Sequence, residues 1–221
     1  MIIEINDLTK IYKVGEVEVP ALNGVSMSVH KGEFVSIMGP SGSGKTTLLN
    51  IIGCIDRPTG GKILISGTDV TAMTEKELDA LRLRKIGFVF QRINLIPILS
   101  AAENVELPME IAGMSPAERR KRTEELLHGV GLSQRAKHRP SQLSAGEQQR
   151  VGIARAIANQ PDILLADEPT GNLDSKTSSE ILTLLCRLNS EFNQSIILVT
   201  HNAEVGKSAH RTIHIRDGKI V

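Results

Sequence analysis

The segment GPSGSGKT, residues 39–46, constrains the fold of this chain more strongly than any other feature. It follows an apolar run at 34–38 and precedes the sequence TLLNII at 47–52, which favours a helix. A glycine-rich loop between a strand and a helix gathers backbone N–H groups around phosphate oxygens. The pattern therefore predicts an α/β nucleotide-binding protein with a phosphate loop.

The parts of this loop have separate expected roles in holding a triphosphate. Glycine has no Cβ, so the backbone can approach the phosphates closely. Lys45 brings a positive charge to the β- and γ-phosphates, and the Thr46 hydroxyl is placed to ligate Mg²⁺. The residues that we expect to line the phosphates are Gly39, Ser41, Gly42, Ser43, Gly44, Lys45, Thr46 and Thr47.

Two adjacent acids supply the second half of such a site. Asp167 and Glu168 follow the apolar run at 163–166. In P-loop enzymes an acid after a neighbouring strand completes the Mg²⁺ shell, and we expect this role for Asp167. Glu168 is then placed to polarise the water that attacks the γ-phosphorus. Adjacent acids also occur in ordinary turns, and it is the phosphate loop that favours the catalytic interpretation.

Short apolar runs predict how the rest of the chain is built. The runs at 34–38, 86–90, 163–166 and 196–199 are typical of central strands in a parallel sheet. At 3–6 and 25–30 apolar and polar residues alternate, which predicts an antiparallel sheet with one solvated face. The C-terminal segment 213–220 reads as a hairpin with Asp-Gly at its turn.

Residues 92–159 lack a clear strand pattern, and we expect them to form a helical subdomain. Within it, Ser115 stands before Pro116 and an acid follows in the first turn, a combination that predicts a helix start. The α/β core would then comprise residues 1–91 and 160–221, with the helical subdomain inserted between its two parts.

Composition limits the partners and the compartment. The formal net charge is +1, which argues against a general nucleic-acid binder. Cys54 and Cys186 are the two cysteines, both in apolar surroundings, so we expect separate core thiols and a reducing compartment. The apolar runs are far shorter than the ~20 residues that span a bilayer, and no secretory signal begins the chain. We therefore expect a soluble, cytoplasmic protein.

A second turn suited to anions lies in the segment LSAGEQQR, residues 143–150, about a hundred residues after the phosphate loop. A glutamine, Gln91, ends one predicted strand and a histidine, His201, ends another. These features, together and in this order, resemble the ATP-binding subunit of an ABC transporter over nearly the whole chain. The resemblance implies a RecA-like P-loop NTPase core, one ATP-binding domain over 1–221, and ATPase activity with ATP and Mg²⁺.

The resemblance also assigns roles within one protomer. Tyr12, the sole tyrosine, lies where the family has an aromatic residue that stacks on adenine, although a half-buried strand aromatic is an alternative reading. Gln91 resembles the glutamine that reaches the metal and water and links the site to the helical subdomain. His201 resembles the histidine that contacts the γ-phosphate.

Other roles imply a second copy of the chain. In this family two copies pack head to tail, and each Leu-Ser-Gly-Gly-Gln signature closes on the γ-phosphate held by the other copy's phosphate loop. Ser144 and Gly146 resemble the signature residues that make this contact. Asp174 resembles the aspartate that crosses the interface between the copies.

Two departures from the family pattern bear on activity. Ala145 replaces the usual glycine of the signature, and its methyl would be unfavourable if the backbone there needed a positive φ. Asn202 replaces a common aspartate after the histidine. Neither changes Lys45, Asp167 or Glu168, so we expect an active ATPase.

The resemblance implies a separate integral-membrane permease, with this subunit peripheral on the inner face of the membrane. It is closest to the group of lipoprotein-releasing and macrolide-exporting ATPases, whose members often work beside a periplasmic adaptor. The segments that carry this likeness are GCIDRPTGG, FVFQRINLIPILSAAENVELP, HRPSQLS and ADEPTGNLD. The cargo and the direction of transport cannot be read from this subunit.

Three other interpretations stay open on the sequence. A soluble ABC-type ATPase of DNA repair or translation usually carries coiled-coil insertions, tandem cassettes or basic surfaces, which are not evident here. A P-loop kinase or GTPase would lack the signature turn. Glu168 and His201 argue against a non-catalytic module that only clamps on ATP, whereas Ala145 keeps that possibility open.

Overall fold

The computed structural model describes all 221 residues apart from the side chain of Val14. Its centre is a six-stranded sheet in the order β10-β9-β3-β8-β7-β6, in which all strands except β10 run parallel. The strands are β3 (Phe34–Met38), β6 (Ile86–Val89), β7 (Ile163–Asp167), β8 (Ser195–Thr200), β9 (Arg211–Arg216) and β10 (Lys219–Ile220). The four apolar runs predicted as strands of one parallel sheet all lie in it.

For one of these strands, β6, the predicted position in the sheet is wrong. β6 is the edge strand of the sheet and not a central one. Its sequence is as apolar as that of an inner strand because α2 and α5 pack against it. The approach of α5 is so close that a Cβ added at Gly87 would lie 2.2 Å from the carbonyl oxygen of Ala156.

A second, antiparallel sheet has the order β2-β1-β4-β5. It consists of β1 (Ile3–Val14), β2 (Val17–Val29), β4 (Gly60–Ile65) and β5 (Thr68–Asp69). Ile3 and Ile5 are buried while Asn6 is exposed, as the alternating pattern predicts. The predicted C-terminal hairpin is also present, and Asp217 and Gly218 at its turn have φ of 49° and 73°.

The helices divide between the two faces of the parallel sheet. They are α1 (Lys45–Ile52), α2 (Glu75–Lys85), α3 (Ala101–Ile111), α4 (Pro116–Gly129), α5 (Ala145–Ala156), α6 (Ser175–Phe192) and α7 (Ala203–Gly206). Ile163 and Leu165 of β7 pack in a core with α1, whereas Leu164 and Ala166 pack in a second core with α5 and α6. Strand side chains alternate in direction, so one apolar strand serves both cores.

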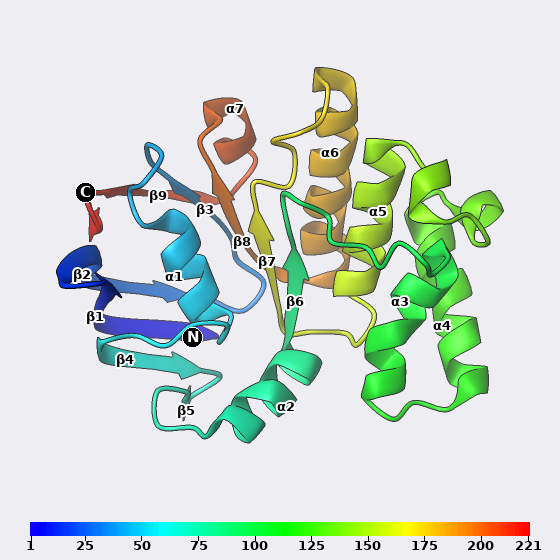
Figure 1. Cartoon of the computed structure of the whole chain (residues 1–221). Helices are drawn as coiled ribbons and strands as arrows, with labels where there is room; N and C mark the ends of the chain where they lie inside the picture. The colour runs from blue at the N-terminus through cyan, green and yellow to red at the C-terminus, as the bar shows by residue number, and fades with distance from the viewer.

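Residues 92–159 contain α3, α4 and α5, which contact one another and form the group of helices at the right of Figure 1. Ser115 caps α4, its side chain accepting a hydrogen bond from the N–H of Glu118, so the predicted helix start is confirmed. In the part of the chain that the structure describes, no helix is long and apolar enough to cross a bilayer. Cys54 and Cys186 are free thiols in different cores.

Candidate nucleotide site

The phosphate loop joins β3 to α1, and close packing fixes its shape. A Cβ added at Gly39 would lie 2.1 Å from the carbonyl oxygen of Ile215, and one at Gly44 would lie 2.4 Å from that of Ala21. Gly44 is also the N-cap of α1 with φ of 100°, a conformation that favours glycine. No described side chain caps this helix, so its first N–H groups point to an anion site.

Two side chains of the loop support the same assignment. The Nζ atom of Lys45 donates hydrogen bonds of 2.8 Å to the carbonyl oxygens of Gly39 and Pro40, although the side chain is almost completely buried. The Ser43 hydroxyl is buried and has no hydrogen-bond partner among the described residues. A buried polar group without a partner is unfavourable, and a phosphate oxygen would supply one.

Asp167 ends β7 directly beside the start of α1. The Thr46 hydroxyl donates to its Oδ1 across 3.3 Å. Burial raises the pKa of Asp167 above its usual value, the Thr46 hydrogen bond opposes this, and the charge of Glu168 adds to the rise. Mg²⁺ prefers oxygen ligands, and in nucleotide sites hydroxyl and carboxylate oxygens of the protein complete a coordination shell that also includes phosphate oxygens. The two residues therefore fit the expected metal.

Glu168 occupies an unusual backbone position next to Asp167. Its φ is 43°, and its N–H donates to the carbonyl of Val199 on the neighbouring strand across 2.9 Å. Its Oε1 lies 2.9 Å from Nδ1 of His201. The carboxylate can only accept, so Nδ1 of the histidine carries the proton in this contact. The structure thus brings together two of the three residues predicted for catalysis, from the ends of β7 and β8.

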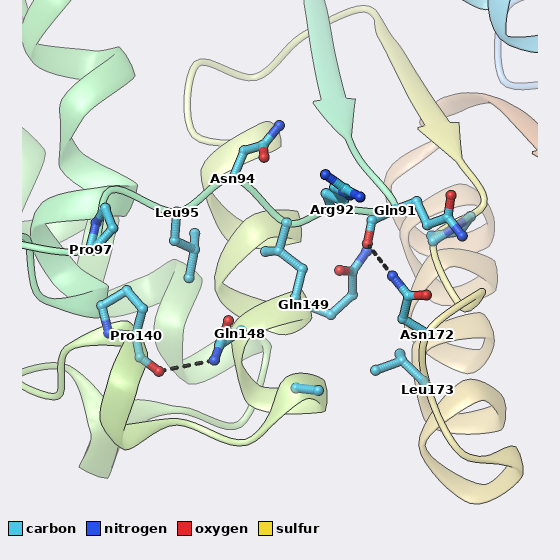
Figure 2. Close-up of a pocket in the computed structure, with 13 residues that line it drawn as sticks. Gln91, Arg92, Asn94, Leu95, Pro97, Pro140, Gln148, Gln149, Asn172 and Leu173 are labelled. Carbon is cyan, nitrogen blue, oxygen red and sulfur yellow. Dashed lines mark hydrogen bonds between the residues drawn. The ribbon is translucent and has the colours of Figure 1, made fainter.

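Gln91 follows the end of β6, and its side-chain amide also lies near Glu168. A Cβ added at Gly171 would lie 2.8 Å from Nε2 of Gln91 and 3.3 Å from Oε2 of Glu168. The Gln91 amide therefore lies over Gly171, close to the Glu168 carboxylate. Asn172 holds the backbone of this loop by donating from Nδ2 to the Gln91 carbonyl at 3.3 Å, as Figure 2 shows.

Tyr12 stands on β1, and its ring is partly exposed. Its hydroxyl donates to Oδ2 of Asp56 across 2.7 Å, and the Nζ atom of Lys10 lies 4.7 Å from the ring centroid. Lys10 also pairs with Oδ1 of Asp56 at 2.6 Å. Burial, followed by the hydrogen bond to Asp56, raises the pKa of Tyr12. These contacts hold the ring in one orientation, with Lys10 over one of its faces.

The predicted signature turn begins α5. The Ser144 side chain accepts a hydrogen bond of 3.2 Å from the N–H of Glu147. Gly146 packs against α6: a Cβ there would lie 2.4 Å from Cγ2 of Thr177. At the start of α6, Asp174 accepts from the N–H and the hydroxyl of Thr177 at 3.0 and 2.6 Å. The signature turn and the Asp174 turn thus meet at Thr177.

The helices that follow the phosphate loop and the signature turn pack on opposite faces of the sheet. The phosphate loop leads into α1, which packs in one core, and the signature turn leads into α5, which packs in the other. In Figure 1, β8, β7 and β6 stand between the two helices. The helices that begin at the phosphate loop and at the signature turn are therefore separated by the sheet.

The structure accommodates both departures from the family pattern, Ala145 and Asn202. Ala145 is the first residue of α5 and has helical backbone, so the position does not need a positive φ. Its side chain is exposed. Asn202 is the N-cap of α7, and its Oδ1 accepts from the N–H of Glu204 across 2.9 Å. Asparagine caps a helix as well as aspartate does, so the substitution leaves this helix start intact.

Glu147 is a functional candidate that the sequence analysis missed. It occupies the position where the Leu-Ser-Gly-Gly-Gln signature has glutamine. The signal in the sequence is the negative charge that glutamate brings to a turn suited to anions. Its Oε2 accepts from the N–H of Ser144 across 2.8 Å, which completes a capping box. Its Oε1 pairs with Nε of Arg135 at 3.1 Å.

A cavity of about 330 Å³ lies between the loop after Gln91, the start of α5 and the loop at Asn172. Figure 2 shows Leu95, Gln148 and Leu173 on its different sides. The Nε2 atom of Gln148 donates to the Pro140 carbonyl across 3.0 Å, which ties the start of α5 to the preceding turn. The cavity thus borders Gln91, the loop at 169–173 and the signature turn.

Comparison with known proteins places these features in a family. A family model described as ABC transporter matches residues 22–171. The chain is 56% identical to an uncharacterized ABC transporter ATP-binding protein of Thermotoga maritima, over 99% of this chain and 93% of that protein. It is 52% identical to the macrolide export ATP-binding/permease protein MacB of Marinobacter nauticus, over the whole of this chain but only 34% of that protein.

A solved structure agrees with the fold. The chain superposes with a TM-score of 0.92 on the ATP-binding cassette MJ0796, whose structure is described as a dimeric post-hydrolysis state bound to ADP and Pi. The two sequences are 50% identical, over 99% of this chain and 96% of that one.

Proposed function

This chain belongs to the ABC transporter ATP-binding family, and from that premise we propose how its residues bind ATP, hydrolyse it and pass on the resulting motion. The chain is an ATPase subunit of a transporter. Membership in this family argues against a P-loop kinase or GTPase, and the relatives described above are transporter subunits and not proteins of DNA repair or translation.

Within one protomer, the phosphate loop holds the triphosphate and Tyr12 stacks on the adenine. Thr46, Asp167 and Gln91 hold Mg²⁺, which when bound neutralises charge on the phosphates. Glu168 accepts a proton from the attacking water, and His201 keeps the carboxylate in position while contacting the γ-phosphate. The 2.9 Å contact between Glu168 and His201 supports this division of roles.

The other wall of each site comes from a second copy. Ser144 and Gly146 of one protomer close on the γ-phosphate bound by the other, and Asp174 lies at the interface. The observation that carries this proposal is the placement of α1 and α5 on opposite faces of one sheet. Loss of phosphate after hydrolysis removes charge-assisted contacts, so the pair opens.

Opening and closing drive a membrane permease carried on another polypeptide. We place the contact with it at the cavity beside Gln91 and Leu95, because this cavity adjoins both the loop at 169–173, next to Glu168, and the helical subdomain. The ATPase then works at the inner face of the membrane, in a system of the lipoprotein-releasing or macrolide-exporting type, with an extracytoplasmic adaptor as a further partner. The likeness to MacB supports this type of system.

Mixing two inactive variants tests the shared site. Lys45→Ala removes the loop cation but keeps the signature turn, and Ser144→Arg blocks the turn but keeps the loop. Each variant alone is expected to lack ATPase activity. In the mixture, mixed dimers contain one complete site, so activity should return. Mixed samples that stay inactive, although native gels show mixed dimers, would contradict the proposal.

A further inference from the structure

The carboxylate of Glu147 lies at the phosphate-binding turn and is held from two sides. The Ser144 N–H donates to its Oε2 across 2.8 Å, and Nε of Arg135 lies 3.1 Å from its Oε1. The backbone hydrogen bond from Ser144, with a smaller contribution from Arg135, lowers the pKa of Glu147. The side chain is therefore charged at neutral pH.

A negative charge at this point opposes the proposed contact. The turn is expected to receive the triphosphate of a partner, and like charges repel. In the separate protomer the ion pair is in contact with water, since the Arg135 side chain is 47% exposed and that of Glu147 is 19% exposed. When a second protomer covers the turn, the local dielectric falls and the repulsion grows unless a cation stays beside the carboxylate.

Arg135 is fixed in a position to supply that cation. It ends the short 3₁₀ turn Ser133–Arg135, and its N–H donates to the carbonyl of Leu132 across 2.9 Å. Its Nη1 lies 3.3 Å from Nε2 of His138. The guanidinium thus has a neighbour on each side, His138 and Glu147, and does not depend on the partner protomer for its orientation.

We propose that Arg135 is a positioning residue for ATP-driven dimerisation, which neutralises Glu147 so that the Ser144 turn can accept the partner's triphosphate. This inference rests on the proposed function, since it requires the signature turn to face the partner's nucleotide. It adds a residue outside the signature turn, whose effect on dimerisation depends on the residue at position 147.

A double-mutant cycle in the hydrolysis-blocked Glu168→Gln background tests the proposal. The dimer dissociation constant is measured with Mg²⁺-ATP by analytical ultracentrifugation. Arg135→Gln should raise it about tenfold, which corresponds to ~1.4 kcal/mol. Glu147→Gln, whose amide oxygen still accepts from Ser144, should leave it unchanged or lower it. With Glu147→Gln present, Arg135→Gln should have little further effect.

Two controls separate this role from a structural one. Arg150→Gln breaks the other ion pair of α5, between Arg150 and Glu180, and should change the dissociation constant less than twofold. The effect of Arg135→Gln should shrink as salt rises, because screening weakens the uncovered charge of Glu147. The unfolding temperatures of the ATP-free Arg135→Gln and Arg150→Gln protomers should fall by similarly small amounts, because each variant loses one surface ion pair.

The outcomes that overturn the inference are distinct from failure of the proposed function. An Arg135→Gln effect that is equal with and without Glu147→Gln would show that Arg135 acts independently of the carboxylate. No effect in either background would also overturn the inference. If the Glu168→Gln parent itself does not dimerise with ATP, the shared site proposed above fails, and this inference fails with it.

Discussion

The Nδ1 atom of His201 lies 2.9 Å from Oε1 of Glu168, and the contact joins the ends of two parallel strands. The strained backbone at Glu168, with φ of 43°, turns its side chain toward this histidine. A carboxylate held in this way is suited to accept a proton from water. The contact with His201 fixes the position of the Glu168 carboxylate.

This relationship predicts different effects for the two residues. Glu168→Gln removes the base and should lower the ATPase rate about 10²- to 10⁴-fold while ATP binding is kept. His201→Ala keeps the base but removes the contact that positions it and the proposed contact with the γ-phosphate, so it should lower both the ATPase rate and the affinity for ATP. The measurements are steady-state phosphate release and nucleotide affinity by fluorescence. Hydrolysis that does not fall in Glu168→Gln would remove Glu168 from its role.

Asp167 predicts a pH dependence of stability in the absence of nucleotide. Burial raises its pKa in the folded protein, so the folded state disfavours the charged form. The stabilising effect of a neutral Asp167 is complete below the unfolded pKa and is lost as pH rises through the folded pKa. Asp167→Asn should therefore raise the melting temperature at pH 7, and the difference should vanish in acid.

Asp174 serves as the control for this experiment because its shift has the opposite sign. The hydrogen bonds from the hydroxyl and N–H of Thr177 lower its pKa, so its charged form stabilises the fold above the unfolded pKa. Asp174→Asn should lower the melting temperature at pH 7, with the difference lost in acid. Melting curves of the three proteins between pH 3 and pH 8 separate the two cases; parallel shifts of both variants would contradict the assignment.

A third prediction concerns Arg155 of α5. Its guanidinium donates to the carbonyl oxygens of Ile93 and Asn94 at 2.9 and 2.8 Å, and so holds the loop after Gln91 against the helix. Arg155→Ala should cost about 2–3 kcal/mol in the free energy of unfolding, since two charge-assisted hydrogen bonds are lost in a partly buried place.

Urea unfolding measures this cost, and Arg150→Ala provides the comparison. Arg150 is on the same helix but has one ion pair, with Glu180 at 3.2 Å, so its loss should cost under about 1 kcal/mol. Equal costs for the two variants would show that the carbonyl contacts of Arg155 add nothing.

The sequence predicts the strands and the cluster of residues at their carboxyl ends because both depend on short-range patterns. Parallel strands end at a common edge, so Gln91, Asp167 and His201 converge once the strands are identified. The pair of Arg135 and Glu147 could not be predicted in this way. It depends on how the two short turns before α5 fold back, and no periodic pattern encodes that path.

Short-range patterns also do not show that β6 is an edge strand, or that position 145 has helical backbone and needs no positive φ. An apolar run shows that both faces of a strand are covered, but not whether another strand lies beside it. At Ala145 the pattern gave the residue type but not the helix boundary. Once α5 is seen to begin at this residue, alanine is an ordinary helical residue there.

The last prediction concerns the packing of the signature turn on α6. A Cβ at Gly146 would lie 2.4 Å from Cγ2 of Thr177, so Gly146→Ala should force the two helix starts apart and cost about 1–3 kcal/mol. Thr177→Ser removes this methyl and keeps a hydroxyl for Asp174, so it should restore stability to Gly146→Ala. Ala145→Gly, one residue earlier, is the control and should cost under about 1 kcal/mol. Urea unfolding and ATPase assays of the single and double variants test the contact; if Thr177→Ser does not restore Gly146→Ala, the glycine is needed for a reason other than space beside Thr177.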